Sequence, residues 1–401
     1  MKNILLILGL FALSFYSNAQ SENIVIGKID TINSSILNEK RPIWIHKPDN
    51  VIDNSDTPKQ YPVVYLLDGD WHFVSVVGML QQLSYINGNT ICPAMIVVGI
   101  PVKDRFRDLT PTCDSLISVT SGGYNNFISF IDKELIPYID STYQTAPYKI
   151  LIGHSLGGLT VMNTIIKSPE MFNAYVAIDP SMWWDNQISL KEAKISLSEK
   201  RFENKRLFLA IANNMNRGMD TISVRTDNTR NTLSIRSILE LSDNLNSNTD
   251  NKLNYQTKYY INEKHSSIPL IATYDALHFI FDFYNFPIDK SDYADTTMAL
   301  GYRIENHYNV VSEKMGYKIY PSESIINTLG YNAIYMNNLA LSEYFFKMNI
   351  KNYPDSYNAY DSLGDYYLAI NDKEQAINMF EKSLSIFENP DTRKKLESIK
   401  N

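Results

Sequence analysis

Cysteine, glycine and proline are all scarce in this chain. Its 401 residues include two cysteines, 16 glycines and 16 prolines. Two cysteines cannot cross-link a chain of this size, which excludes a small disulfide scaffold, and so little glycine and proline excludes a fibrous or linker-rich protein. Hydrophobic residues make up 44% of the chain, which excludes general disorder. The stability of the fold must therefore come from an apolar core.

Charge of one sign is also missing. The 37 basic and 44 acidic side chains give a formal net charge of −7, and no block of five or six like charges occurs. A nucleic-acid-binding protein or a protein bound to an anionic membrane surface would need a basic patch. We therefore expect neither nucleic acid nor a membrane surface as a partner.

Long hydrophobic runs are limited to one, at the N-terminus. Lys2 precedes an apolar run over residues 4–15, and small residues follow at Ser17 and Ala19. A run of about 12 residues is too short for the roughly 20 that span a bilayer, but it is typical of a secretory signal peptide. We predict cleavage after Ala19, export to the periplasm or the medium, and no lipid anchor.

Export would permit a disulfide between Cys92 and Cys113, but the expected geometry argues against it. Cys92 opens an apolar strand, and Cys113 lies well past the other end of that strand. Such a strand covers about 20 Å, whereas bridged Cα atoms lie within about 7 Å. Only a loop that returns along the strand would close the gap, so we predict two unpaired cysteines that pack in the fold.

Short β-rich runs alternate with helical stretches from residue 61 to 278. This alternation predicts an α/β fold, with a mostly parallel sheet and helices on both faces. Residues 23–48 are expected to pair onto one edge of the sheet. The clearest strands are residues 63–67, 95–100, 150–153, 175–178, 207–212 and 256–261, and the clearest helices are residues 124–139 and 266–284.

The last 80 residues repeat with a period of 34. This shift maps four positions onto four others: Leu329 onto Leu363, Gly330 onto Gly364, Ser342 onto Ala376 and Phe346 onto Phe380. The pattern resembles the tetratricopeptide repeat (TPR), and an ordinary pair of helical hairpins is the alternative. We predict a signal peptide over 1–19, an α/β domain over 20–290, a connecting segment over 291–322, and TPR-like repeats with a capping helix over 323–401. Such a tail could bind a protein partner.

Residues 153–157 read Gly-His-Ser-Leu-Gly, and Gly158 follows. This is the G-x-S-x-G pattern of a nucleophile elbow, and it lies between a predicted strand and a predicted helix, as an elbow requires. The glycines let strand and helix approach closely while the turn exposes the serine hydroxyl. Ser155 is the candidate nucleophile.

A serine hydroxyl needs a base within hydrogen-bond reach. His265 fits best, because it follows the last predicted strand and lies downstream of the serine. His278 lies inside a helix and is expected to pack. His72 comes too early in the chain, and His154 occupies the variable position of the elbow.

The acid that would orient the base is harder to assign. Chain order places it shortly after strand 207–212, where Asn213 and Asn214 stand instead. Asp220 is the next acid and satisfies the order serine, acid, histidine. Glu263, or a dyad with no carboxylate, remains open.

The backbone N–H groups of Leu156 and Asp70 are the candidate oxyanion-hole donors, because one follows the nucleophile and the other lies in the loop after strand 63–67. The aspartates of that loop have no partners at ligand spacing, so no metal is predicted.

Taken together, these segments resemble the putative esterase family, which has the α/β-hydrolase fold and includes esterase D-like, enterochelin esterase-like and feruloyl esterase enzymes. The resemblance covers about residues 25–285 and implies hydrolysis of carboxylic esters, with Ser155 as nucleophile and His265 as base. Members similar to the siderophore esterases include Ser/His dyads, so the missing acid does not contradict it. The segments that carry it are Leu66 to Gly69, Arg107 to Pro111, Gly153 to Gly158, Asp179 to Trp184 and Glu263 to Pro269.

Three aromatic residues, Trp183, Trp184 and Tyr124, are candidates for a substrate pocket, although core packing is the more common role for such residues. Arg107 is a candidate contact for an anionic substrate, and an ion pair with its neighbour Asp108 is the alternative.

We therefore expect an exported serine esterase that acts on a small-molecule ester without a cofactor. An acyltransferase on the same fold is one alternative. A catalytically silent binding protein that acts through its repeat tail is another.

Overall fold

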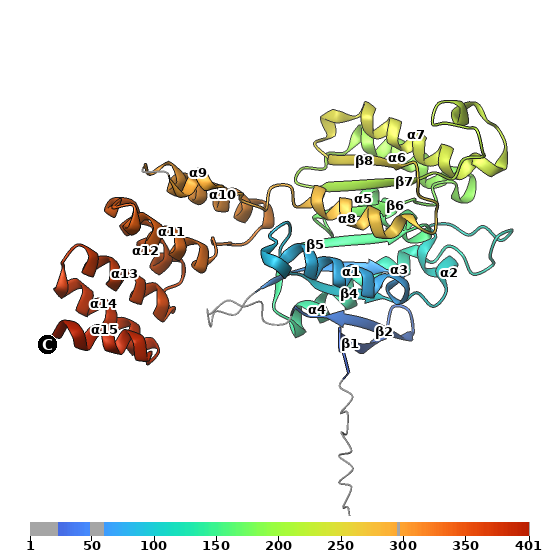
Figure 1. The fold of residues 1–401 in the computed structure, drawn as a ribbon. Coiled ribbons are helices and arrows are strands. Elements are labelled where there is room, and N and C mark those ends of the chain that lie inside the picture. The colour runs from blue at the N-terminus through green and yellow to red at the C-terminus, as the bar shows by residue number, and fades with distance from the viewer. Residues whose placement is uncertain (1–22, 49–59, 295–296, 401) are drawn as a thin grey trace, which may run out of the picture.

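The computed structural model describes residues 23–48, 60–294 and 297–400, so the predicted signal peptide lies outside the described residues. One eight-stranded sheet, in the order β1-β2-β4-β3-β5-β6-β7-β8, forms the centre of the larger unit (Figure 1). Its strands are β1 (Lys28–Ser34), β2 (Glu39–His46), β3 (Tyr61–Leu67), β4 (Ile96–Ile100), β5 (Thr145–His154), β6 (Ala174–Ile178), β7 (Arg206–Ala212) and β8 (Asn254–Tyr260).

Strands β3 to β8 run parallel to one another, and only β1 and β2 run antiparallel to their neighbours. The predicted α/β architecture and the pairing of residues 23–48 at the sheet edge are confirmed. Because the parallel strands all point the same way, the loops that follow them gather at one edge of the sheet.

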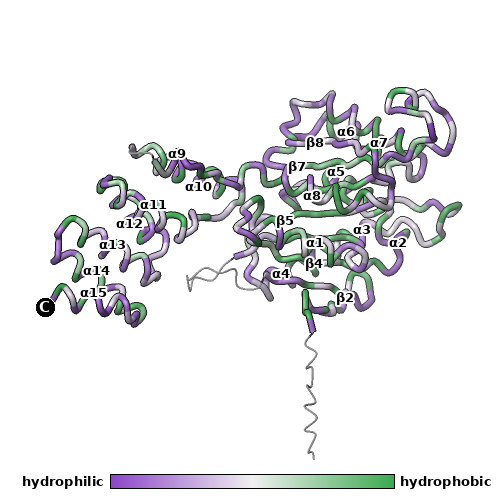
Figure 2. The backbone as a smooth tube through the Cα atoms, viewed as in Figure 1, coloured by the Kyte–Doolittle hydropathy of each residue, from purple (hydrophilic) through white to green (hydrophobic). Residues whose placement is uncertain are grey.

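Helices cover both faces of the sheet. Along β3, Val63 and Tyr65 face one apolar cluster and Val64 and Leu66 face the other, as the alternation of a strand buried on both sides requires. Figure 2 shows these apolar strands between more polar outer segments. The helices are α1 (Gly69–Ser84), α2 (Arg105–Leu109), α3 (Tyr124–Phe130), α4 (Ile136–Thr142), α5 (Leu156–Lys167), α6 (Trp184–Glu199), α7 (Leu233–Ser247) and α8 (Ile268–Ile280).

Shorter turns of helix complete the larger unit. A π-helical turn at Ile131–Leu135 joins α3 to α4, so the predicted helix over 124–139 is one helix with a bulge. Turns of 3₁₀ helix occur at Ile86–Gly88, Ser223–Thr226, Arg230–Thr232 and Thr249–Asn251.

A helical unit follows the sheet domain. It comprises α9 (Lys290–Tyr293), α10 (Ala299–Met315), α11 (Glu323–Tyr335), α12 (Leu339–Asn352), α13 (Tyr357–Ala369), α14 (Lys373–Ile386) and α15 (Pro390–Lys400). None of the helices in the described segments has both the length and the apolar character needed to cross a membrane.

The 34-residue period has a packing cause. A Cβ atom at Gly330 would lie 2.5 Å from the ring of Phe346, and one at Gly364 would lie 2.5 Å from the ring of Phe380. In each hairpin the phenylalanine ring therefore lies directly against the glycine of the preceding helix. The C-terminal tail is two similar helical hairpins, α11–α12 and α13–α14, with α15 packed on the second.

The helical unit joins the sheet domain through α10, at the amino ends of the strands. Val311 and Met315 of α10 belong to the same apolar cluster as Ile280 of α8, and Gly316 lies near Pro147 at the start of β5. Figure 1 shows the tail beyond this end of the sheet. The loop that carries Ser155 follows the other end of β5.

Cys92 and Cys113 are both free thiols in the structure. Cys92 is buried, and its burial raises the pKa of the thiol to about 12. Cys113 is exposed, so only the first of the two packs in the core as predicted.

Candidate active site

Ser155 stands on a sharp turn between β5 and α5. Its backbone has φ 61° and ψ −115°, a strained conformation for a residue with a side chain. The turn is held by a hydrogen bond from the Ser155 N–H to the Ile178 carbonyl at 3.0 Å. A Cβ atom at Gly153 would collide with the carbonyl of Gly157, so only glycine fits there. The sequence pattern therefore folds into the strand, turn and helix of a nucleophile elbow.

His265 lies in the loop between β8 and α8. Its Nε2 atom is 3.0 Å from Oγ of Ser155, and its backbone N–H donates to Oδ1 of Asn214 at 3.1 Å. The His265 side chain is 45% exposed, so this site is open to solvent on one side. The structure thus brings the two predicted residues within direct hydrogen-bond reach.

Asp179 completes the constellation. Its Oδ2 atom lies 2.5 Å from Nδ1 of His265 and accepts a second bond from Nδ2 of Asn214 at 2.7 Å. The Oδ1 atom accepts the backbone N–H of Ala212 at 3.0 Å. This carboxylate is buried. It accepts from Nδ1 of His265, so Nδ1 carries the ring hydrogen and Nε2 is left as the acceptor that faces the Ser155 hydroxyl.

The prediction of Asp220 as the acid that orients His265 is wrong. Its carboxylate accepts the backbone N–H groups of Ile222 and Ser223 in an exposed turn. Glu263, the second candidate, accepts a hydrogen bond from the Ser267 hydroxyl at 2.6 Å and does not bind His265. The hypothesis of a dyad without a carboxylate is also wrong, because Asp179 binds Nδ1 of His265.

The sequence contained two signals for Asp179. This residue directly follows β6, the strand beside the one that carries the serine, so its side chain belongs at the same edge of the sheet. Asn214 stands where an acid was expected and binds that carboxylate instead.

Leu156 and Asp70 lie at two neighbouring helix starts. Leu156 is the first residue of α5, and Asp70 is the second residue of α1. A Cβ atom at Gly157 would lie 3.2 Å from Oδ2 of Asp68 and 3.4 Å from Leu67, so these helix starts approach each other closely. Backbone N–H groups in the first turn of a helix have no acceptor within the helix, and they are free to bind an anion.

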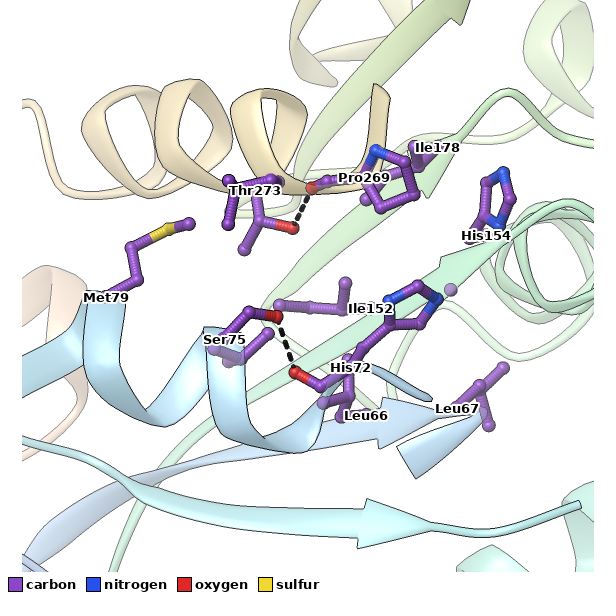
Figure 3. A pocket seen from close by; sticks show the side chains of 13 residues that line it. Leu66, Leu67, His72, Ser75, Met79, Ile152, His154, Ile178, Pro269 and Thr273 are labelled. Carbon is purple, nitrogen blue, oxygen red and sulfur yellow. Dashed lines mark hydrogen bonds between the residues drawn. The ribbon is translucent and has the colours of Figure 1, made fainter. Parts of the chain in front are cut away.

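A row of three histidine rings leads away from the serine. The ring centroids of His154 and His265 are 4.5 Å apart, and those of His72 and His154 are 5.9 Å apart. Figure 3 shows His72 and His154 on the wall of a crevice between α1 and α8, with room for about one water. Burial, reinforced by His265 and His72, lowers the pKa of His154 to about 4, and burial also lowers the pKa of His72. His154 is therefore neutral at pH 7.

Two of the predicted pocket residues belong to the core. Tyr124 is buried and its hydroxyl lies 3.2 Å from Oγ1 of Thr164. Trp184 is buried as well, and its indole N–H donates to the Thr112 carbonyl. Neither side chain reaches a pocket open to solvent, so the prediction is wrong for both. Trp183 is half-buried and packs against the same core.

Arg107 forms ion pairs with Asp108 at 2.6 Å and Glu39 at 2.7 Å. This arrangement favours the ion-pair interpretation of Arg107. The contacts, led by the hydrogen bond from Arg107, lower the pKa of Glu39 to about 2. Arg41 also binds Asp108 at 2.7 Å, with both side chains buried, so this cluster fixes β2 to α2.

Among the described residues, no group of three or more histidine, cysteine, aspartate or glutamate side chains is placed to hold a metal ion.

Comparison with known proteins places this geometry in a family. Residues 34–267 match the family model described as "Putative esterase". The ferri-bacillibactin esterase BesA of Bacillus subtilis is 32% identical over 201 residues, which cover 44% of this chain and 67% of the relative. The siderophore enterobactin esterase of Emericella nidulans is 30% identical over 163 residues, which cover 35% of this chain and 52% of the relative. The match thus spans about two thirds of the first relative and about half of the second.

Among solved structures, an IroE-like serine hydrolase from Shewanella oneidensis is similar to this chain. The TM-score is 0.65 and the sequence identity 29%, and the match covers 80% of this chain and 98% of the other.

Proposed function

The chain belongs to the putative esterase family, and we propose that this ester-hydrolysing enzyme works through an acyl-enzyme on Ser155. One observation carries the proposal: His265 lies 3.0 Å from the Ser155 hydroxyl while Asp179 holds the other ring nitrogen. This is the geometry of a serine, histidine and aspartate triad, in which the base and its orienting acid act on one hydroxyl.

The two half-reactions use the same proton path. As Oγ of Ser155 attacks the ester carbonyl, Nε2 of His265 takes the hydroxyl proton, and Asp179 stabilises the imidazolium. The imidazolium then gives the proton to the leaving alkoxide, and the acyl group stays on Ser155. A water molecule, deprotonated by His265, attacks this acyl-enzyme and releases the acid, and the proton returns to Ser155.

The backbone N–H groups of Leu156 and Asp70 are the proposed oxyanion donors. This assignment is supported by the close approach of the two helix starts beside Ser155. Both helices also direct their positive ends toward this edge of the sheet. Donors fixed in the backbone need no reorganisation as negative charge develops on the carbonyl oxygen.

We propose siderophore esters as the substrate class to test first. Support comes from the names of the two relatives, both siderophore esterases, and from the exposed His265 side chain, which leaves room for a bulky ester. Wild-type protein is expected to release the hydrolysed acid from a ferric siderophore ester, measured by liquid chromatography. If only simple esters are cleaved, the siderophore class is wrong while the mechanism stands.

A burst assay tests the mechanism. With p-nitrophenyl acetate, wild-type protein should release a burst of nitrophenol, and Ser155→Ala should release none. Ser181→Ala is the matched control, because its hydroxyl lies 3.4 Å from that of Ser155. This variant should keep the burst. Absence of a burst in wild-type protein, with no phosphonate labelling of Ser155, would favour the silent binding protein.

Export and a partner for the tail are separate proposals. The apolar run over residues 4–15 supports cleavage after Ala19, and a mature N-terminus at Gln20, measured by mass spectrometry of the exported protein, would test it. The helical hairpins lie at the amino ends of the strands, so a protein bound there would leave Ser155 accessible.

A further inference from the structure

Trp71 is a large aromatic side chain left in solvent. It is the third residue of α1, directly after the proposed oxyanion donor Asp70, and it is 63% exposed. Exposed tryptophan is enriched where proteins bind ligands, because its broad rigid surface contributes contact area at little cost in conformational entropy.

A buried anchor holds this ring in place. The guanidinium of Arg105 lies 5.0 Å from the centre of the Trp71 ring. Arg105 is fixed in turn by two hydrogen bonds to the Asp68 carboxylate, at 2.8 Å and 3.1 Å, and Asp68 is buried. The starts of α1 and α2 therefore position one exposed indole, and its orientation is set before any ligand arrives.

The first turn of α1, which carries Trp71, lies beside the nucleophile elbow. Asp68 approaches Gly157, two residues after Ser155, and the neighbour of Trp71, His72, faces His154 on the other side of the serine. The first turn of α1 therefore borders the turn that presents the nucleophile. An acyl group on Ser155 would therefore lie next to this turn.

We propose that Trp71, held by Arg105, stacks on an electron-rich aromatic ring of the ester substrate. This subsite rests on the proposed function. A cation over one face of an indole draws electron density from it, so the ring pairs best with an electron-rich partner such as a phenol. The charge of Arg105 is already balanced by Asp68, so the subsite recognises a ring rather than an anion.

Matched esters test the subsite. Methyl para-hydroxyphenylpropanoate and methyl cyclohexylpropanoate differ in the aromaticity and hydroxyl of the ring on the acyl side. A second pair, para-hydroxyphenethyl acetate and cyclohexylethyl acetate, places the ring on the alcohol side. In Trp71→Ala the ratio of kcat/KM for aromatic over saturated ester should fall about fivefold to tenfold in at least one pair.

Two further variants serve as controls. Trp71→Phe keeps an aromatic face and should retain most of the preference. Val74→Ala removes a side chain equally exposed, at 63%, on the same helix and should match the wild-type ratio. A Trp71→Ala ratio unchanged in both ester pairs would overturn the subsite while leaving the esterase mechanism intact.

A binding measurement separates this inference from catalysis. In Ser155→Ala, para-hydroxyphenylpropanoate should quench tryptophan fluorescence, and the added Trp71→Phe change should remove that quenching. Quenching that persists with the same affinity in the double variant would contradict the subsite. If wild-type protein shows no burst with p-nitrophenyl acetate but Trp71 is quenched, the proposed function fails and the aromatic subsite stands.

Discussion

Oδ2 of Asp179 lies 2.5 Å from Nδ1 of His265, and the two residues are 86 positions apart in the chain. Asn214 supports both of them, since its amide nitrogen donates to Asp179 and its oxygen accepts the backbone N–H of His265. The loops after three strands, β6, β7 and β8, thus meet at one hydrogen-bonded group. The position of the base depends on all three loops.

Asp179→Asn should lower kcat by about a thousandfold or more. An amide that donates to Nδ1 favours the His265 tautomer with its hydrogen on Nε2, and an amide has no negative charge to stabilise the imidazolium. Turnover of p-nitrophenyl acetate measures the loss. Asp220→Asn is the matched control and should keep near wild-type turnover, since its side chain serves only an exposed turn. Equal losses in the two variants would contradict the assignment of Asp179.

Asn214→Asp should lower kcat. It would replace the amide that donates to Asp179 with a carboxylate, which cannot donate a hydrogen bond and repels the Asp179 side chain. Asn214→Ala removes the hydrogen bonds without adding charge, so it should lower kcat by less. Turnover of p-nitrophenyl acetate measures both variants, and wild-type turnover in Asn214→Asp would count against this network.

His154 should make the fold sensitive to acid. Unfolded histidine titrates near pH 6.5. Burial lowers the pKa of His154 to about 4 in the folded protein. Between these values only the unfolded chain binds the proton, so stability is fully present above about pH 6.5 and falls as the pH drops toward 4.

In wild-type protein this histidine should remove about 2 kcal/mol of stability between pH 7 and pH 5. His72, whose pKa burial also lowers, contributes with the same sign. Urea unfolding of wild-type protein and His154→Gln at the two pH values provides the measurement. An identical pH dependence in the two proteins would show that His154 does not titrate in this range.

The tail should be sensitive to single methyl groups. Gly330→Ala and Gly364→Ala each force a Cβ atom against a phenylalanine ring at 2.5 Å, and each should destabilise the tail by about 1 to 3 kcal/mol. Gly78→Ala is the control, because its Cβ would meet no atom within 4 Å. This change lies inside α1 and should stabilise the protein by roughly 0.5 to 1 kcal/mol. Thermal unfolding measures all three variants.

Local patterns in the sequence predicted the parallel strands and the positions of Ser155 and His265. An elbow and a buried parallel strand each have a pattern that lies within a few consecutive residues. The contact of Asp179 is different. It depends on the relative positions of three loops, and chain order alone favoured a residue after β7. Asp179 also adopts φ 41°, a backbone conformation that the neighbouring residues do not predict.

The burial of single aromatic residues could not be predicted from local sequence either. Tyr124 and Trp184 carry polar atoms that suit either a pocket or the interior. What decides is the partner of that atom: Thr164 for the tyrosine and the Thr112 carbonyl for the indole. These partners lie 40 and 72 residues away in sequence, so the choice is made by tertiary packing.

Three adjacent parallel strands, β3, β5 and β6, are each followed directly by a residue with positive φ: Asp68 at 50°, Ser155 at 61° and Asp179 at 41°. Glycine would relax each backbone, and it would also delete the side chain of Asp68 that binds Arg105, the proposed nucleophile Ser155 or the proposed acid Asp179. Selection for thermal resistance and selection for turnover therefore act in opposite directions at these positions. A screen that selects only for heat tolerance would therefore enrich inactive proteins. A library in which these three residues are held fixed could be selected for stability without losing activity at these positions.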